Sequence, residues 1–246
     1  MIRACIGISL CLISLPAVAS EKRVNQFIDI ALGNEYRDQT SHLRRWHDPI
    51  RVKLHQKVSL NSTLLTLVDE HLTLLERATN HPIKRVDTQS NVDVYLVKHQ
   101  ALAQTWQRYA NGQLPSDALC AAQITTDQSD QITRAVVMIP VDRASQQGRL
   151  LSCLVEELTQ ITGLVNDSVD VYPSIFNDLS TDQMITSLDW AFLRTLYHPS
   201  LQAGMAEARV RQISRDLLSD SNVVPLLNEG KVIIAQSNLF QLLSVD

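Results

Sequence analysis

The sequence predicts a single mixed α/β (α+β) domain, in which a mixed sheet packs against helices. Apolar residues recur at intervals of three and four in several segments, as in amphipathic helices, whereas other segments alternate or are continuously apolar, as strands are. Seven Gly and eight Pro together make up about 6% of the 246 residues, well below the usual roughly 12% for these two types. Most of the chain is therefore expected to be regular structure, in the order helix, strand, helix, strands and then helices.

Helical periodicity is clearest in residues 64–78, where Asn61 or Ser62 can cap the start. His71 lies on the apolar stripe of this segment, so we expect it to be a hydrogen-bonded core residue rather than a ligand. A helix is also expected at residues 24–32, where Gly33 ends it. The other expected helices cover residues 150–163, 187–197 and 205–218.

Strands are expected between these helices. Alternation at Ile50, Val52 and Leu54 predicts a strand with one buried face. Residues 133–141 are apolar on both faces, as central strands are, and the polar turn 127–130 is expected to join them to a strand at 121–125. A further strand is expected at residues 92–97, and residues 221–246 are expected to be a turn-rich tail with one short strand at 232–235.

Residues 1–19 have the pattern of a signal peptide. Arg3 gives a basic start, residues 4–15 are almost continuously apolar, and Ala17-Val18-Ala19 is the small-residue pattern of a cleavage site. We expect cleavage after Ala19 and an exported protein, periplasmic or secreted; a membrane anchor is the alternative. The apolar run is shorter than the roughly 20 residues that span a bilayer, and no later segment is a candidate. One domain is expected over residues 20–220, followed by the tail at 221–246.

Cleavage would remove Cys5 and Cys11 and leave Cys120 and Cys153. In an oxidising compartment, such a pair is most simply a disulfide, and two buried thiols are the alternative.

Charge argues against nucleic acid as a partner. The chain has 22 basic and 26 acidic residues, without a dense Lys/Arg cluster. Arg44, Arg45 and Trp46 form one small basic and aromatic group, for which a contact surface and packing of Trp46 beside the strand that starts at Ile50 are both open.

Polar residues around the end of the expected helix 150–163 form the one candidate site. Glu156 and Gln160 are four residues apart and therefore share a helix face, and Glu157 is next to that pair. Gly163 can turn the chain back, and Asn166 follows three residues later. The side chains of Glu156, Gln160 and Asn166 could thus converge, with the carboxylate of Glu157 beside them.

This layout resembles the zinc-binding helix of the metzincin peptidases, whose pattern is His-Glu-x-x-His-x-x-Gly-x-x-His followed by a Met-containing turn and a helix. The resemblance puts Glu156, Gln160 and Asn166 at the three His positions, Glu157 at the catalytic Glu and Gly163 at the Gly. Downstream, Ser174-Ile175-Phe176-Asn177 resembles the turn, with Phe176 in place of Met, and residues 185–197 resemble the following helix. The resemblance implies a zincin-like fold. The chain also resembles an exported bacterial family of unknown function, through FIDIALGNEY, RRWHDPIRV, EELTQITGLVND, PSIFND and LRTLYHP.

The departures from the metzincin pattern concern chemistry. Glu156, Gln160 and Asn166 offer only hard oxygen ligands where zinc sites use imidazole, so we expect neither zinc nor another cofactor. A solvated helix face that ends at Gly163 would explain the same residues. Asp189 has an explanation of its own, because Thr186-Ser187-Leu188-Asp189 has the pattern of a capping box.

The sequence therefore favours a non-catalytic binding or structural module on a degenerate peptidase scaffold. Its partner is unknown; an extended peptide or a protein in the former substrate cleft, paired with an edge strand, would suit such a scaffold. The alternative is a peptidase-like hydrolase in which Glu157 is the general base, with Glu156 sharing a proton and with an oxygen-ligated metal or none.

Overall fold

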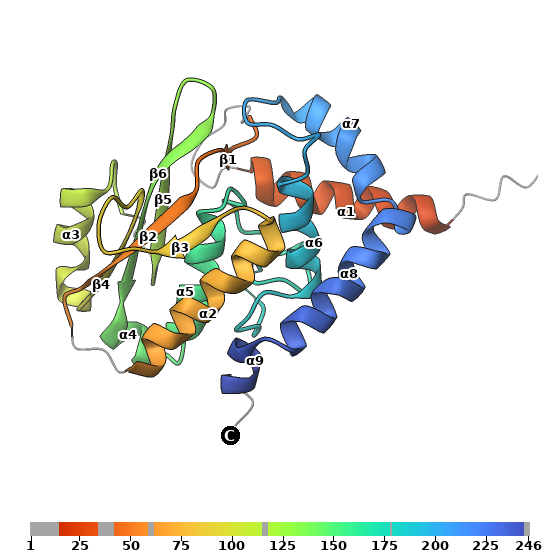
Figure 1. Cartoon of the computed structure of the whole chain (residues 1–246). Coiled ribbons are helices and arrows are strands. Elements are labelled where there is room, and N and C mark those ends of the chain that lie inside the picture. Colours follow the sequence, from red (N-terminus) through yellow and green to blue (C-terminus); the bar gives the residue numbers. More distant parts are fainter. Residues whose placement is uncertain (1–14, 34–41, 59–61, 115–117, 178, 244–246) are drawn as a thin grey trace, which may run out of the picture.

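A computed structural model describes residues 15–33, 42–58, 62–114, 118–177 and 179–243 (Figure 1). Most of the expected leader, residues 1–14, lies outside the described residues. In the described ranges, no helix is both long enough and apolar enough to cross a membrane.

The predicted mixed α/β class is confirmed by a sheet in which six of the described segments pair. The strand β6 (Gln131–Pro140) is central, as expected from its two apolar faces, and the only antiparallel pairing in the described sheet joins it to β5 (Ala121–Thr126). The short strands β1 and β3 have too few residues to show a periodicity. The parallel strands lie in the order β1 (Arg45–Trp46), β6 (Gln131–Pro140), β4 (Val92–Val97), β2 (Ile50–Gln56) and β3 (Ile83–Arg85), and β5 is Ala121–Thr126.

Helices pack on both faces of the sheet (Figure 1). Because successive residues of a strand point to opposite faces, β4 contributes to two apolar clusters. Val94 belongs to the main core, whereas Tyr95 belongs to a smaller cluster with Trp106 of α3 (Leu102–Tyr109). The sheet shares the main core with α1 (Leu15–Leu32), α2 (Ser62–Thr79), α5 (Leu150–Gln160) and α6 (Ser187–Leu196). The helix α5, which carries most of the candidate site, packs in the main core, so the site lies on this side of the sheet.

The expected helices are present with ends shifted by a few residues, except that the first begins earlier: α1 (Leu15–Leu32), α2 (Ser62–Thr79), α5 (Leu150–Gln160), α6 (Ser187–Leu196) and α7 (Glu207–Leu217). Three short helices have no clear sequence signal: η1 (His99–Ala101), α3 (Leu102–Tyr109) and α4 (Val141–Gln146). The last of these takes Val141 from the expected strand.

The expectation of a turn-rich tail with a strand at residues 232–235 is wrong. The chain there forms two helices, α8 (Asp220–Ala235) and α9 (Asn238–Leu243). Val and Ile favour strands locally, but α8 is held by its packing on α6. Its Gly230 lies so close to Trp190 that a Cβ would be 2.7 Å from the indole side chain.

The expected disulfide between Cys120 and Cys153 is present, with the two Cα atoms 5.9 Å apart. It ties the residue before β5 to α5, and a loop of this size contributes about 3–4 kcal/mol in the chain-entropy account.

His71 is a core residue, as predicted. Its Nε2 lies 3.1 Å from the carbonyl oxygen of Val155 and 3.2 Å from the hydroxyl of Thr159, both on α5. Burial lowers the pKa of His71 to about 4, so the imidazole is neutral at pH 7 and joins α2 to α5.

Candidate functional site

The candidate carboxylates and Gln160 lie on α5 at different depths. Glu157 is 6% exposed, whereas Glu156 and Gln160 are half-buried. This difference follows from helix geometry, because Glu156 and Gln160 share one face and Glu157 lies a third of a turn away.

Beyond α5 the chain makes a turn that only glycine fits well. Gly163 has φ +122°, and a Cβ there would lie 2.4 Å from the carbonyl oxygen of Arg44. The turn therefore needs both the backbone freedom and the small size of glycine. It is followed by residues 164–177 and 179–180, which we call the post-turn segment.

The first residues of the post-turn segment pack against the end of α1. The backbone N–H groups of Val165 and Asn166 both donate to the carbonyl of Ile30, at 3.0 and 3.1 Å. The side-chain amide of Asn166 donates to the carbonyl of Asp29 at 3.2 Å, and Asn166 is 8% exposed. A Cβ on Gly33 would lie 2.3 Å from the Asn166 amide nitrogen, so this residue fills the space at the helix end.

Gln160 also uses its amide within the fold. Its Nε2 donates to Asp167 Oδ1 at 3.0 Å, which shows that the chain returns alongside α5 after the turn. Gln160 therefore lies beside Asp167, the residue after Asn166. The Asn166 amide, in contrast, donates to a carbonyl of α1. Within the described part of the chain, no group of three or more His, Cys, Asp and Glu side chains is arranged to hold a metal ion.

Two aromatic side chains bind the carbonyls at the end of α5. Trp46 Nε1 donates to the carbonyl of Ile161 at 2.7 Å, and the Tyr197 hydroxyl donates to the carbonyl of Thr162 at 2.8 Å. Burial raises the pKa of the Tyr197 hydroxyl, which stays protonated and can donate. Sequence reasoning misses these contacts because the partners lie 115 and 35 residues apart in the chain.

The basic and aromatic group around Trp46 is structural in large part. Trp46 is 1% exposed, in a strand that pairs with β6 rather than with the strand starting at Ile50. The Arg45 guanidinium donates to the carbonyl of Leu196, the last residue of α6, and to the carbonyls of His198 and Leu201 beyond it. Burial lowers the pKa of Arg45, but an arginine so placed remains charged at pH 7.

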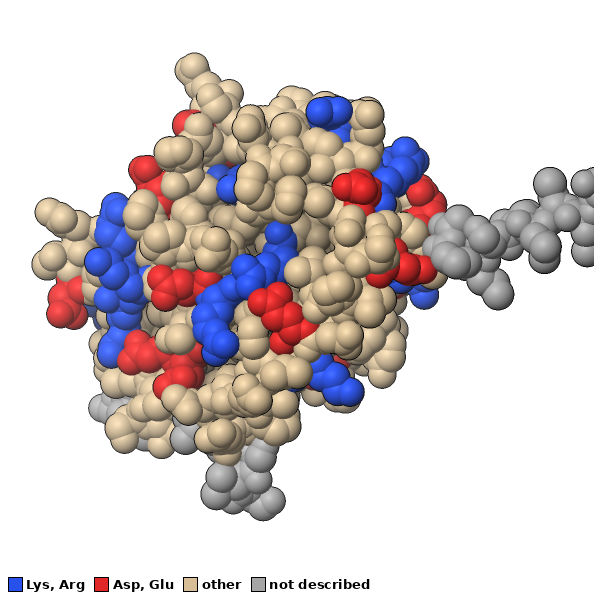
Figure 2. All heavy atoms as spheres, turned by 45° about the vertical axis from the view of Figure 1, so that its right-hand side comes forward, with Lys and Arg blue, Asp and Glu red and all other residues tan. Residues whose placement is uncertain are grey.

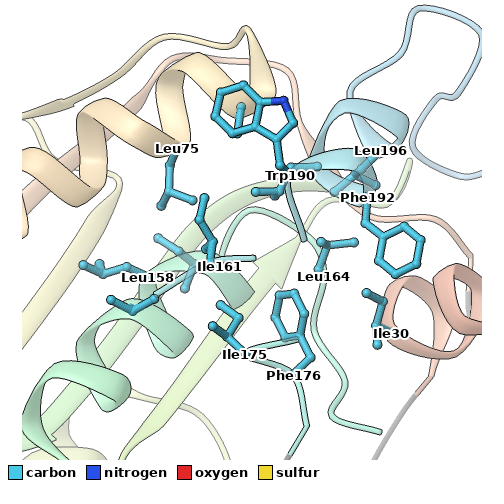
Figure 3. Close-up of a cluster of buried hydrophobic side chains, with 14 of the residues drawn as sticks. Ile30, Leu75, Leu158, Ile161, Leu164, Ile175, Phe176, Trp190, Phe192 and Leu196 are labelled. Atoms are coloured by element: carbon cyan, nitrogen blue, oxygen red, sulfur yellow. The ribbon is translucent and has the colours of Figure 1, made fainter. Parts of the chain in front are cut away.

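A second turn, residues 174–177, follows the Gly163 turn and carries Phe176 into the main core (Figure 3). Phe176 is fully buried, and its ring lies beside Leu164 and Ile175, with Ile30 of α1 nearby. The carbonyl of Phe176 accepts the backbone N–H of Ser168 at 2.7 Å, which closes the loop between them. The two turns thus pack as one unit beneath α1 and α6.

Asp189 joins this second turn to α6. Its carboxylate accepts Ser174 Oγ at 2.5 Å, the Ile175 N–H at 3.2 Å and the Thr186 N–H at 2.7 Å. The capping box with Thr186 is confirmed, because the Thr186 hydroxyl in turn accepts the Asp189 N–H. Burial raises the pKa of Asp189 to about 6, although these hydrogen bonds lower it.

A cavity of about 930 Å³ borders the site on the side of α1. Its lining includes Gln26, Asp29, Asp170 and Arg211, so it shares Asp29 with the bond to Asn166 and Asp170 with the post-turn segment. On the face in Figure 2, most of the surface is uncharged, and basic and acidic side chains lie next to one another in several places.

Comparison with protein families identifies one match. A family described as "Protein of unknown function (DUF2927)" matches residues 20–216, which is most of the chain. The curated proteins include no match to this sequence.

Proposed function

This chain belongs to the DUF2927 family, and we propose that it is an exported, non-catalytic binding module on a degenerate zincin-like scaffold. One observation carries the proposal: two residues at the positions of metal ligands use their amides to hold the fold. Asn166 donates to the carbonyl of Asp29, and Gln160 donates to the carboxylate of Asp167.

The order of elements supports the scaffold. A central strand, β6, precedes α5, and α5 is followed by the Gly163 turn, the buried turn at Phe176 and then α6. This is the order that the metzincin resemblance implies. Trp46, Tyr197 and Asp189 hold the same two turns through buried hydrogen bonds, which supports a frame held by the chain's own side chains.

The chemistry of the ligand positions supports a non-catalytic role. Glu, Gln and Asn provide oxygen where a zinc peptidase provides imidazole nitrogen. Without a metal that acidifies water and polarises the carbonyl, Glu157 alone would lack several kcal/mol of transition-state stabilisation. Binding a peptide or a protein requires none of this chemistry.

The competing function is hydrolysis with Glu157 as general base, and peptide cleavage decides between the two. The disulfide-bonded chain is incubated with a mixture of peptides of known sequence, with Mg²⁺ or Ca²⁺ or with a chelator, and the products are identified by mass spectrometry. We expect no cleavage above a buffer control by the natural chain or by Glu157→Gln. Cleavage that Glu157→Gln abolishes, while Glu156→Gln retains it, would replace the proposal with the enzyme.

Export is part of the proposal. The leader pattern of residues 1–19 and the disulfide between Cys120 and Cys153 both suit an oxidising compartment. The intact mass of the protein recovered from cells tests it. We expect a chain that begins at Ser20 and gains two protons on reduction; a full-length, already reduced chain from the cytoplasm would contradict export.

A further inference from the structure

The post-turn segment presents apolar side chains to solvent. Val169, Tyr172 and Leu179 are 60%, 70% and 80% exposed. Isolated exposed apolar residues are ordinary, but three on one short segment are typical of an interaction surface.

The backbone under these side chains is fixed. Asn177 Nδ2 donates to the carbonyls of Val169 and Val171, at 3.0 and 2.9 Å. Gln26 of α1 donates to the carbonyl of Asp170 at 2.7 Å. The backbone that carries the apolar side chains is therefore held in place before any partner arrives, which lowers the entropy lost on binding.

The sequence around them is rich in acidic residues, and three acidic residues line the adjoining cavity together with Lys22 and Arg211. Residues 150–193 contain seven Asp and Glu and no Lys, Arg or His. In the adjoining cavity along α1, Glu21 pairs with Arg215 at 3.2 Å and with Arg211 at 3.8 Å. Asp29 and Asp170, which also line the cavity, form no ion pair with any residue in the described ranges.

We propose that this face, made by Val169, Tyr172 and Leu179 with Asp29 and Asp170, binds a protein segment in which apolar or aromatic residues flank a Lys or Arg. The apolar side chains of the segment cover Tyr172 and its neighbours, and its cation lies in the cavity beside α1. Charge complementarity selects a basic segment over an acidic one. This inference rests on the proposed binding function and gives it a location and a partner chemistry.

Selection from a phage-displayed library of short random peptides tests the proposal on the oxidised chain. We expect enriched peptides to carry Lys or Arg next to Leu, Phe, Tyr or Trp. Affinity of a synthetic copy should fall about tenfold for Tyr172→Ala, as for a central aromatic contact, and about threefold for Asp170→Asn. Added salt should weaken binding to the natural chain more than to Asp170→Asn.

Two matched variants are controls. Val232→Ala removes an exposed apolar side chain of α8, and Asp87→Asn removes an exposed carboxylate far from the segment in sequence; both should bind as the natural chain does. Thermal unfolding of all four variants checks that each is folded.

The outcomes separate this inference from the proposed function. Peptides that bind Tyr172→Ala and Asp170→Asn as tightly as the natural chain would overturn the location while leaving a binding module. Acidic peptides, or a library without enrichment, would overturn the partner chemistry. Peptides that are cleaved only when Glu157 is present would instead overturn the non-catalytic function.

Discussion

The inner and outer faces of the post-turn segment differ in what their side chains do. On the inner face, Phe176 is fully buried and Asn166 binds the end of α1. On the outer face, Tyr172 and Leu179 are 70% and 80% exposed on a backbone that hydrogen bonds hold in place. The comparison separates two roles: Phe176 and Asn166 stabilise the frame, whereas Tyr172 and Leu179 are exposed to solvent.

Truncation of Phe176 gives the largest expected contrast between the faces. Phe176→Ala should lower the free energy of unfolding by about 3–5 kcal/mol, because it leaves a cavity between α1, the Gly163 turn and α6. Tyr172→Ala, on the outer face, should change it by less than about 0.5 kcal/mol. Urea denaturation measures both, and similar losses for the two variants would remove the distinction.

The Gly163 turn provides the next contrast. Gly163→Ala should cost about 2–4 kcal/mol, because positive φ is combined with a contact to the carbonyl of Arg44. Gly148 also has positive φ, +67°, but a Cβ there meets nothing within 4 Å. Gly148→Ala should therefore cost only about 1 kcal/mol. Equal losses in thermal unfolding would mean that the close approach at Gly163 is unimportant.

The buried carboxylate under the second turn gives a dependence on pH. Because the folded pKa of Asp189, about 6, lies above its ordinary 3.8, its stabilising effect is present at low pH and is lost as pH rises through about 6. The free energy of unfolding of the natural chain should therefore fall by about 1–3 kcal/mol relative to Asp189→Asn between about pH 4 and 6.5.

His71 is the matched control with the opposite sign. Its folded pKa, about 4, lies below the ordinary 6.5, so its stabilising effect is present above pH 6.5 and is lost on acidification. The natural chain should gain stability relative to His71→Gln over the same rise in pH. Parallel curves for Asp189→Asn and the natural chain would show that Asp189 is not buried in the way described.

The smallest expected effect concerns Asn166 and Gln160, whose side-chain amides form hydrogen bonds within the fold. Asn166→Ala removes a buried hydrogen bond to Asp29 and should cost about 1–2 kcal/mol, whereas Gln160→Ala loses a half-buried bond and should cost less than about 1 kcal/mol. Chemical denaturation measures both. No loss in Asn166→Ala would indicate that this amide is retained for something other than the fold.

Local signals predict much of this fold, and contacts between distant segments account for the rest. Periodicity is enough to find α2, α5 and β6, and the glycine after α5 indicates its turn. The tail is the clear failure, because apolar β-branched residues near 232–235 favour a strand until packing of Gly230 on Trp190 is known.

The candidate site shows the same limit. The spacing of Glu156, Gln160 and Gly163 is visible in the sequence, as is the cap at Asp189. The roles of Trp46 and Tyr197 are not, since each binds a carbonyl far away in the chain. The bond of Asn166 to α1 spans 137 residues and has no local signature.

The zinc content of the oxidised chain tests most directly whether Gln160 and Asn166 are structural residues rather than metal ligands. The protein is equilibrated with excess zinc, separated from free metal by gel filtration and analysed for metal per chain. The account predicts far less than one zinc, with no change in Gln160→Ala or Asn166→Ala. One zinc per chain, lost in those two variants, would contradict it and assign the oxygen-bearing side chains a metal after all.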